Sequence, residues 1–91
     1  MKEIIVLTVR EDLIEKKAEE KLFILTSDGR HLFSLNEVGA FIWNAFKHNK
    51  AKNDIVKDLV SLYDVEEGQA IKDVDVFIKE VRKHSAELIN P

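Results

Sequence analysis

The feature that most constrains this chain is a β-hairpin sequence that runs directly into a capped helix. Residues 21–26 and 30–35 are short apolar runs on either side of Asp28-Gly29, a pattern that predicts two antiparallel strands. Asp-Gly favours a two-residue type I′ turn, and the length of the turn fixes the strand register. The predicted pairs are Thr26–His31, Leu25–Leu32, Ile24–Phe33, Phe23–Ser34 and Leu22–Leu35.

This register gives the hairpin two apolar faces, because side chains alternate across a strand. One face carries Leu22, Ile24, Phe33 and Leu35, and the other carries Phe23, Leu25 and Leu32. One face must pack on the helices. The other needs a cover, which the N-terminal segment, a second subunit or a ligand would provide.

A helix is predicted over residues 36–47, immediately after the hairpin. Asn36 is a good N-cap, and Gly39 in the first turn indicates that another part of the chain lies close. The apolar stripe has helical spacing and comprises Val38, Phe41, Ile42, Ala45 and Phe46. Trp43 lies off this stripe. We therefore expect Trp43 at the edge of the core and partly buried, with a binding anchor as the alternative.

Two further helices follow in the sequence. The second is predicted to begin near Asn53 or Asp54, and Asp64 with Glu67 forms a capping-box pattern for the third. The second stripe comprises Ile55, Val56, Leu59, Val60 and Tyr63, and the third comprises Ala70, Ile71, Val74, Phe77, Ile78 and Val81.

The third helix is apolar over a wider arc than a three-helix core requires. Asp73, Phe77, Glu80 and His84 form one flank of its stripe, and Val76 lies just beyond that flank. Residues 4–9 are predicted as a strand or arm, and residues 13–17 as a weaker strand. The fold class is therefore α+β and winged-helix-like, with an antiparallel hairpin or three-stranded sheet followed by three α-helices.

Composition narrows the class of protein. The 91 residues make one small domain spanning residues 1–91. The chain has no cysteine, which suits a reducing cytosol. The apolar run at residues 4–7 is too short for a signal peptide or a membrane span. We expect a soluble, cytoplasmic protein.

Catalytic and metal-binding signals are weak. His31, His48 and His84 have no ligand spacing and no cysteine to complete a zinc site. No nucleophile motif or phosphate loop is present. We expect no enzyme activity, no metal and no cofactor.

The hairpin and the segment Leu35-Asn36-Glu37-Val38-Gly39-Ala40-Phe41-Ile42-Trp43 resemble PqqD-like proteins, whose pattern there is LNxxGxxIW. Later residues match the family's helices in order and spacing, namely Asp54-Ile55-Val56, Leu59, Tyr63-Asp64-Val65, Asp73-Val74, Phe77-Ile78 and Val81. The resemblance covers nearly the whole chain. One departure is the end of the third helix, which lacks the glycine that closes it in many family members.

The resemblance implies a peptide-recognition domain of ribosomally made, modified natural products. Such a domain binds the leader of a precursor peptide and presents it to a modifying enzyme, such as a radical SAM protein of pyrroloquinoline quinone synthesis or a lasso-peptide leader protease. In the family the leader adds a strand beside the last hairpin strand and the third helix. Carried onto this chain, the peptide-binding residues are Arg30, His31, Leu32, Phe33, Ser34, Asp73, Val76, Phe77, Glu80 and His84.

Two other functions remain open at this stage. One is a DNA-binding winged helix, because Lys72, Lys79, Arg82 and Lys83 give the third helix a basic side. A formal net charge of −3 counts against it. The other is a dimerisation module, a homodimer in which the N-terminal arm is exchanged between subunits.

Overall fold

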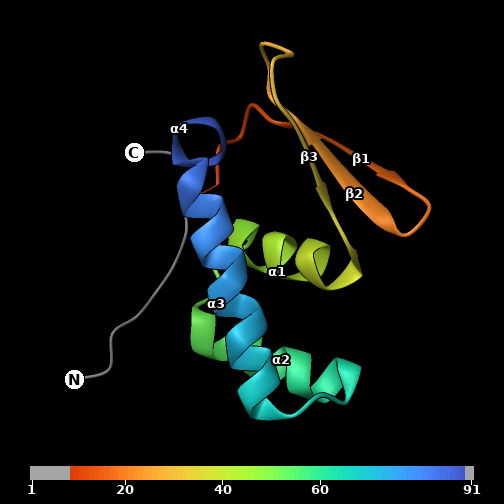
Figure 1. Cartoon of the computed structure of the whole chain (residues 1–91), viewed down its shortest axis with the longest axis vertical. Helices are drawn as coiled ribbons and strands as arrows, with labels where there is room; N and C mark the ends of the chain where they lie inside the picture. Colours follow the sequence, from red (N-terminus) through yellow and green to blue (C-terminus); the bar gives the residue numbers. More distant parts are fainter. Residues whose placement is uncertain (1–8, 90–91) are drawn as a thin grey trace.

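The computed structural model describes residues 9–89, and Figure 1 shows a sheet set against a group of helices. The elements are β1 (Ile14–Ala18), β2 (Lys21–Leu25), β3 (Leu32–Leu35), α1 (Glu37–Lys47), α2 (Lys52–Tyr63), α3 (Glu67–Lys83) and α4 (Ser85–Leu88). The sheet is antiparallel in the order β1-β2-β3. The predicted α+β architecture is confirmed. The predicted arm lies outside the described residues except for Val9, which forms a bridge with Ile89.

The register of the β2–β3 hairpin is as predicted, but its turn is not. The predicted pairs from Leu22–Leu35 to Leu25–Leu32 are all formed. A type I′ turn needs positive φ at both central residues, and here Gly29 has φ +74° whereas Asp28 does not have a positive φ. The Gly29 N–H donates to the Thr26 carbonyl oxygen at 2.9 Å. The loop therefore spans residues 27–30, and β3 begins two residues later than expected.

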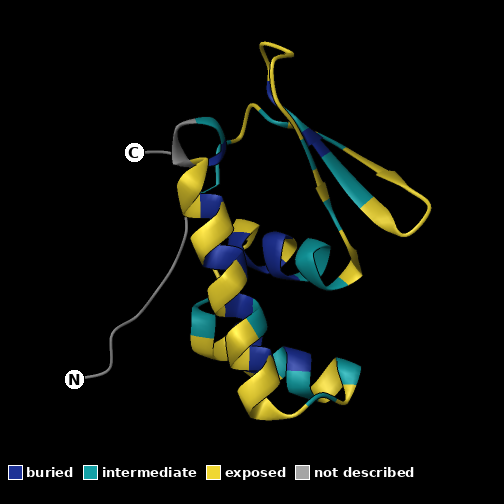
Figure 2. Ribbon diagram, in the orientation of Figure 1, coloured by how far each residue is buried: buried dark blue, intermediate teal, exposed yellow. Residues whose placement is uncertain are grey.

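The two faces of the sheet have different surroundings. Ile24 on the inner face is 1% exposed and belongs to the core that α1 completes (Figure 2). On the outer face, the two registers align Ile14, Leu25 and Leu32 in one row across all three strands. Ile14 is 55% and Leu32 65% exposed. The second apolar face predicted from the sequence is therefore confirmed, and its two edge positions are open to solvent among the described residues.

Helix α1 begins at the predicted cap. The Asn36 side-chain Oδ1 accepts from the Gly39 N–H at 2.8 Å. A Cβ atom on Gly39 would lie 3.2 Å from that oxygen and 3.4 Å from the Cβ of Leu35, the last residue of β3. The glycine therefore permits close packing where the strand turns into the helix.

Trp43 is deeply buried, with 1% of its surface exposed. The expectation of partial burial at the core edge was wrong. The helical stripe accounts for the side of α1 that faces the other helices, but α1 is also covered by the inner face of the sheet (Figure 1). A residue off the stripe is therefore buried as well.

The starts of α2 and α3 differ from the predicted caps. Ala51 is the N-cap of α2, without a side-chain hydrogen bond. Asp64 does not cap α3. It adopts the left-handed conformation (φ 51°) and ends α2, a role in which Asp is tolerated. Glu66 is the N-cap of α3.

Aromatic pairs join the three helices along the predicted stripes. Phe46 of α1 stacks on Phe77 of α3 with ring centroids 6.1 Å apart. Phe41 meets Tyr63 of α2 edge to face at 5.8 Å. An ion pair between Lys52 and Asp75 also links α2 to α3. These contacts fix α3 relative to α1, on which the sheet also packs.

Replacing Asn36 tests the junction between the strand and the helix. Asn36→Ala removes the acceptor for the Gly39 N–H, and we expect the free energy of unfolding to fall by about 1 kcal/mol, measured by urea denaturation. Asn36→Asp is the control, because it keeps the acceptor and adds a charge that favours the helix N-terminus. Equal losses in both variants would contradict the capping role.

Candidate functional site

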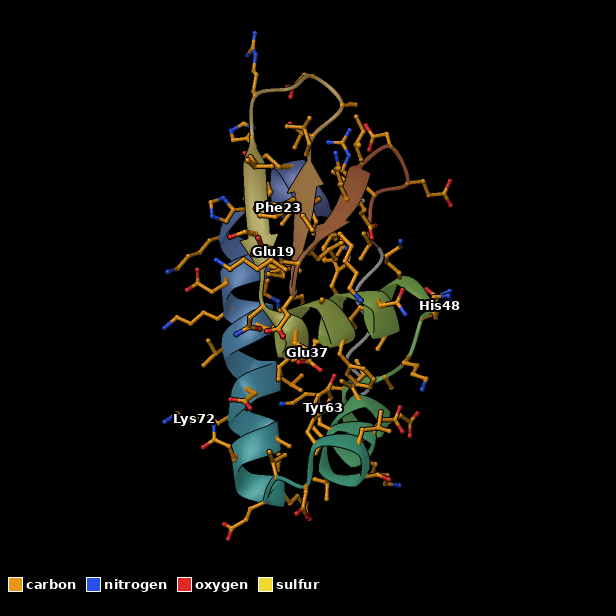
Figure 3. All side chains as sticks on the ribbon, turned by 90° about the vertical axis from the view of Figure 1, so that its right-hand side faces the viewer. Glu19, Phe23, Glu37, His48, Tyr63 and Lys72 are labelled. Carbon is orange, nitrogen blue, oxygen red and sulfur yellow. The ribbon has the colours of Figure 1, made fainter. Side chains whose placement is uncertain are left out.

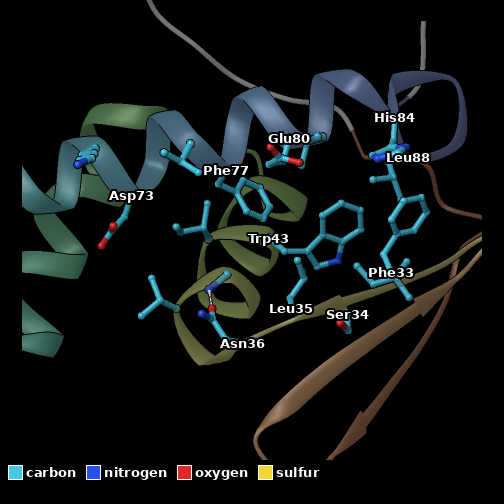
Figure 4. A pocket seen from close by; sticks show the side chains of 17 residues that line it. Phe33, Ser34, Leu35, Asn36, Trp43, Asp73, Phe77, Glu80, His84 and Leu88 are labelled. Atoms are coloured by element: carbon cyan, nitrogen blue, oxygen red, sulfur yellow. Dashed lines mark hydrogen bonds between the residues drawn. The ribbon is translucent and has the colours of Figure 1, made fainter.

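A cleft of about 570 Å³ lies between β3 and α3, with α1 beneath it (Figure 4). Residues from the sheet, from α1 and from α3 and α4 all contribute to its lining. They are Ile24, Phe33, Ser34, Leu35, Asn36, Val38, Gly39, Ile42, Trp43, Lys72, Asp73, Val76, Phe77, Glu80, Val81, His84 and Leu88. Its floor is apolar, and its charged residues come from α3.

The strand beside the cleft is an edge of the sheet. β3 is last in the strand order, and it is the strand nearest α3 in both Figure 1 and Figure 3. In an antiparallel pair, backbone groups point alternately toward the partner strand and away from it. The Thr26 N–H donates to the His31 carbonyl oxygen at 3.0 Å, which sets this alternation. It follows that Leu32 and Ser34 direct their N–H and C=O groups to the free edge, which no strand within residues 9–89 covers.

One end of the cleft is closed by contacts between β3 and the end of α3. The Phe33 ring meets the His84 ring edge to face, with centroids 5.0 Å apart. His31 lies 6.3 Å from Phe33 in a stacked arrangement, and its Nε2 is 3.8 Å from Glu87 Oε1 in α4. Many family members have a glycine after the third helix. This chain instead continues into the short helix α4, whose Leu88 is buried.

The structure brings seven of the ten predicted site residues into this one cleft, namely Phe33, Ser34, Asp73, Val76, Phe77, Glu80 and His84. Arg30, His31 and Leu32 are not part of its lining. Arg30 is exposed in the loop, and the Leu32 side chain lies on the outer face of the sheet, as its pairing with Leu25 requires. Leu32 nevertheless belongs to the free edge through its backbone.

Sequence reasoning missed most of the floor. Ile42 was assigned to the core, and Trp43 to the core edge with a binding anchor as the alternative. Ile24 and Leu35 were placed on one face of the hairpin, and Lys72 on the basic side of the third helix. The alternation of the hairpin already placed Ile24 and Leu35 on the same face as Phe33, but did not show that this face is the inner one. Nothing in the sequence showed that α3 would stand far enough from β3 to leave that face accessible.

A smaller cavity of about 450 Å³ lies at the hairpin loop, and most of the residues that line it are polar or charged. It is lined by Arg10, Asp12, Leu13, Thr26, Ser27, Asp28, His31 and Glu87. The Arg10 guanidinium and the Ser27 hydroxyl donate to Asp12 and hold the pKa of its carboxyl below the usual range. Its polar groups largely satisfy one another. Within residues 9–89, no cluster of three or more side chains suited to holding a metal ion is found.

Comparison with known proteins assigns this chain to a protein family. The sequence profile of Coenzyme PQQ synthesis protein D (PqqD) matches residues 21–86, from β2 to the start of α4. The fold and the cleft thus define the class of protein, which is a small α+β domain with a cleft beside an edge strand. The chain belongs to the PqqD family. Comparison with curated proteins returned no match.

Two solved structures share the fold. One, described as lasso peptide synthetase B1 complexed with the leader peptide, superposes with a TM-score of 0.79 at 18% identity, over 93% of this chain and 98% of that chain. The other, TbiB1 in complex with the TbiA(beta) leader peptide, gives a TM-score of 0.75 at 18% identity, over 90% of this chain and 94% of that chain. In the part of this chain that the structure describes, no helix has the length and apolar character needed to cross a membrane.

Protonation of Asp28 tests how the loop before β3 is held. The Thr26 hydroxyl and the Arg30 N–H both donate to Asp28 Oδ1, and they hold the pKa of this carboxyl below its usual 3.8. A lowered pKa stabilises the folded state above the unfolded value and loses that contribution as pH falls through the folded value. Below about pH 4, the free energy of unfolding should therefore decrease more steeply in the wild type than in Asp28→Asn, as measured by urea denaturation. Identical pH profiles would contradict this role.

Proposed function

We propose that this protein binds the leader of a ribosomally made precursor peptide in the cleft and presents it to a modifying enzyme. The observation that carries the proposal is the apolar cleft directly beside the free edge of β3. An added strand gains backbone hydrogen bonds from such an edge, and side-chain pockets beside it supply selectivity. Both solved relatives are described as complexes with leader peptides, which supports the same class of ligand here.

This geometry supports the peptide-binding residues that the family resemblance implies. Leu32 and Ser34 supply backbone groups at the edge, and Arg30 and His31 flank the start of that edge. Phe33, Asp73, Val76, Phe77, Glu80 and His84 supply the cleft wall. An edge left open would otherwise be prone to uncontrolled pairing with other chains, so an edge beside an apolar cleft is better explained as a binding surface.

The proposed role is non-catalytic and requires no cofactor, because binding and presentation need only the cleft and the sheet edge. The partner is a peptide-modifying enzyme, such as a radical SAM protein or a leader protease. The lack of cysteine agrees with a cytoplasmic location. We also propose that residues 1–91 form a single domain.

The charges of α3 support a peptide rather than DNA as the ligand. Its cations alternate with carboxylates, and two ion pairs engage those carboxylates: Lys83 with Glu80 at 3.2 Å, and Lys52 with Asp75. DNA binding needs a surface whose cations are available to displace counterions from phosphates. Carboxylates of α3 pair with nearby lysines and would repel phosphates, so this helix lacks such a surface.

The first test is titration of the domain with the leader of the precursor peptide encoded nearest to its gene, followed through backbone amide chemical shifts. We expect shifts concentrated at Leu32, Ser34 and the cleft side of α3. Binding of duplex DNA with a steep salt dependence, and no response to the leader, would contradict the proposal.

A charge placed on the cleft wall should weaken leader binding without unfolding the domain. Val76 lines the cleft and is 52% exposed, so Val76→Glu leaves the core intact. Peptide binding would bury the new carboxylate beside apolar groups, which is unfavourable, and we expect affinity to fall at least ~10-fold in isothermal titration calorimetry. Leu62→Glu on α2 is the matched control, because Leu62 is 64% exposed and does not line the cleft. Equal affinities of the two variants would place the peptide elsewhere.

Strand addition predicts an alternating response to backbone methylation of the leader. Along the bound segment every second N–H faces β3, so N-methylation at those positions removes a hydrogen bond to the sheet. We expect weaker binding at alternate positions, measured by competition against the unmodified leader. A response with helical period, or none, would contradict binding as an extended strand.

A further inference from the structure

The floor of the cleft contains a buried hydrogen-bond donor with no partner. Trp43 is 1% exposed, and its Nε1 exposes less than 1 Å² while making no hydrogen bond to any described residue. Buried polar groups in native proteins are almost always paired. Leaving a buried donor unpaired is costly, because the group has lost its hydrogen bonds to water. An indole N–H in this condition therefore points to an acceptor that arrives with a ligand.

The position of the indole directs this donor toward the cleft. Trp43 comes from α1 and lines the cleft. In Figure 4 its nitrogen faces β3, between the side chains of Phe33 and Leu35. Both of these side chains are only half-buried. The nitrogen is covered in the unbound protein, so a peptide side chain would reach it by moving these two half-buried side chains apart.

The backbone of the peptide is poorly placed to satisfy this donor. An added strand lies in the plane of the sheet, about 4.8 Å beyond β3. Trp43 lies beneath the sheet, on the helix that packs against its inner face. Only an inward-facing side chain of the peptide extends in that direction, so the acceptor must be at the tip of such a side chain.

The surroundings favour a neutral acceptor over a carboxylate. The groups around the floor are apolar, among them Ile24, Ile42 and Phe77. A carboxylate buried there would lose its hydration for one hydrogen bond, which does not compensate the cost. The carboxylates of Asp73 and Glu80 on the cleft wall would also repel it. A hydroxyl or amide oxygen carries no net charge, so its loss of hydration costs far less and the two carboxylates do not repel it.

On this basis, and resting on the proposed leader-binding function, we propose that Trp43 determines specificity by donating its indole N–H to a neutral oxygen at the tip of one inward-facing leader side chain. This donor increases the affinity for leaders that carry, at that position, an apolar side chain ending in a hydroxyl or amide group. A leader with a purely aliphatic side chain there leaves the N–H buried and unpaired.

The first experiment uses the wild-type protein and the leader encoded nearest to its gene. The chain has a single tryptophan, so its one indole N–H resonance reports on this atom alone. We expect a downfield shift of the indole proton and slower exchange with solvent when the leader binds. An indole resonance that does not move, while the backbone amides of β3 do, would overturn the role of Trp43 and leave the proposed function standing.

The second experiment removes the donor and keeps the ring. Trp43→3-benzothienylalanine replaces the N–H by sulfur in a side chain of nearly the same shape, and Trp43→Phe is the genetically encoded counterpart. We expect leader affinity to fall about 3- to 10-fold, the worth of one hydrogen bond, while melting temperature changes little in the sulfur variant. Unchanged affinity in the sulfur variant would overturn the proposal.

A third experiment identifies the residue of the leader that accepts the indole N–H. Each inward-facing polar residue is replaced in turn by an apolar residue of similar size, such as Tyr by Phe or Gln by Met. One replacement should weaken binding to the wild type but not to the sulfur variant, which is the signature of a direct pair in a double-mutant cycle. Additive losses at every position would overturn the proposal. Failure of the wild type to bind any leader would overturn the proposed function itself, so the two failures are distinguishable.

Discussion

The structure depends on the turn at Leu35 and Asn36, where an edge strand becomes a helix within one residue. The Asn36 side chain accepts the Gly39 N–H, and Gly39 has no Cβ to collide with Leu35. Together they start α1 at the end of β3 and direct it beneath the inner face of the sheet. Every later packing contact follows from this placement, because α2 and α3 meet α1 through Phe41 and Phe46.

The cleft is a consequence of how α3 is held. Phe77 fixes α3 against α1, and His84 meets Phe33 at the end of the helix. Between these two contacts, β3 and α3 leave a space whose floor is the buried face of α1. The sheet edge and the floor therefore adjoin one cleft, in which we propose separate roles in recognition for the backbone groups of β3 and the indole of Trp43.

Several features were predictable because they depend on neighbours in the sequence. The register from Leu22 to Leu35 follows from a loop centred on Asp28-Gly29. The predicted register is correct, although the predicted turn type is wrong. The hairpin between β1 and β2 was harder to predict, because it turns through Glu19 with φ 57°, a conformation that glutamate adopts only at a cost. The α2–α3 junction was misread for a related reason. Aspartate is a favoured helix N-cap and is also tolerated at a left-handed helix end, and at Asp64 packing selects the second role.

The sequence by itself determined the order of the main elements, the register of the hairpin, the cap of α1 and most residues of the helical stripes, because each depends on alternation or spacing along the chain. Ile71, predicted on the third stripe, is instead 38% exposed and lies outside the core. It also placed seven of the cleft residues together, through the resemblance to the family. Only the tertiary structure decided that Trp43 is buried, that its N–H lacks a partner and that α3 stands apart from β3. These properties depend on surfaces that meet only when the sheet, α1 and α3 pack together, and no local pattern in the sequence encodes them.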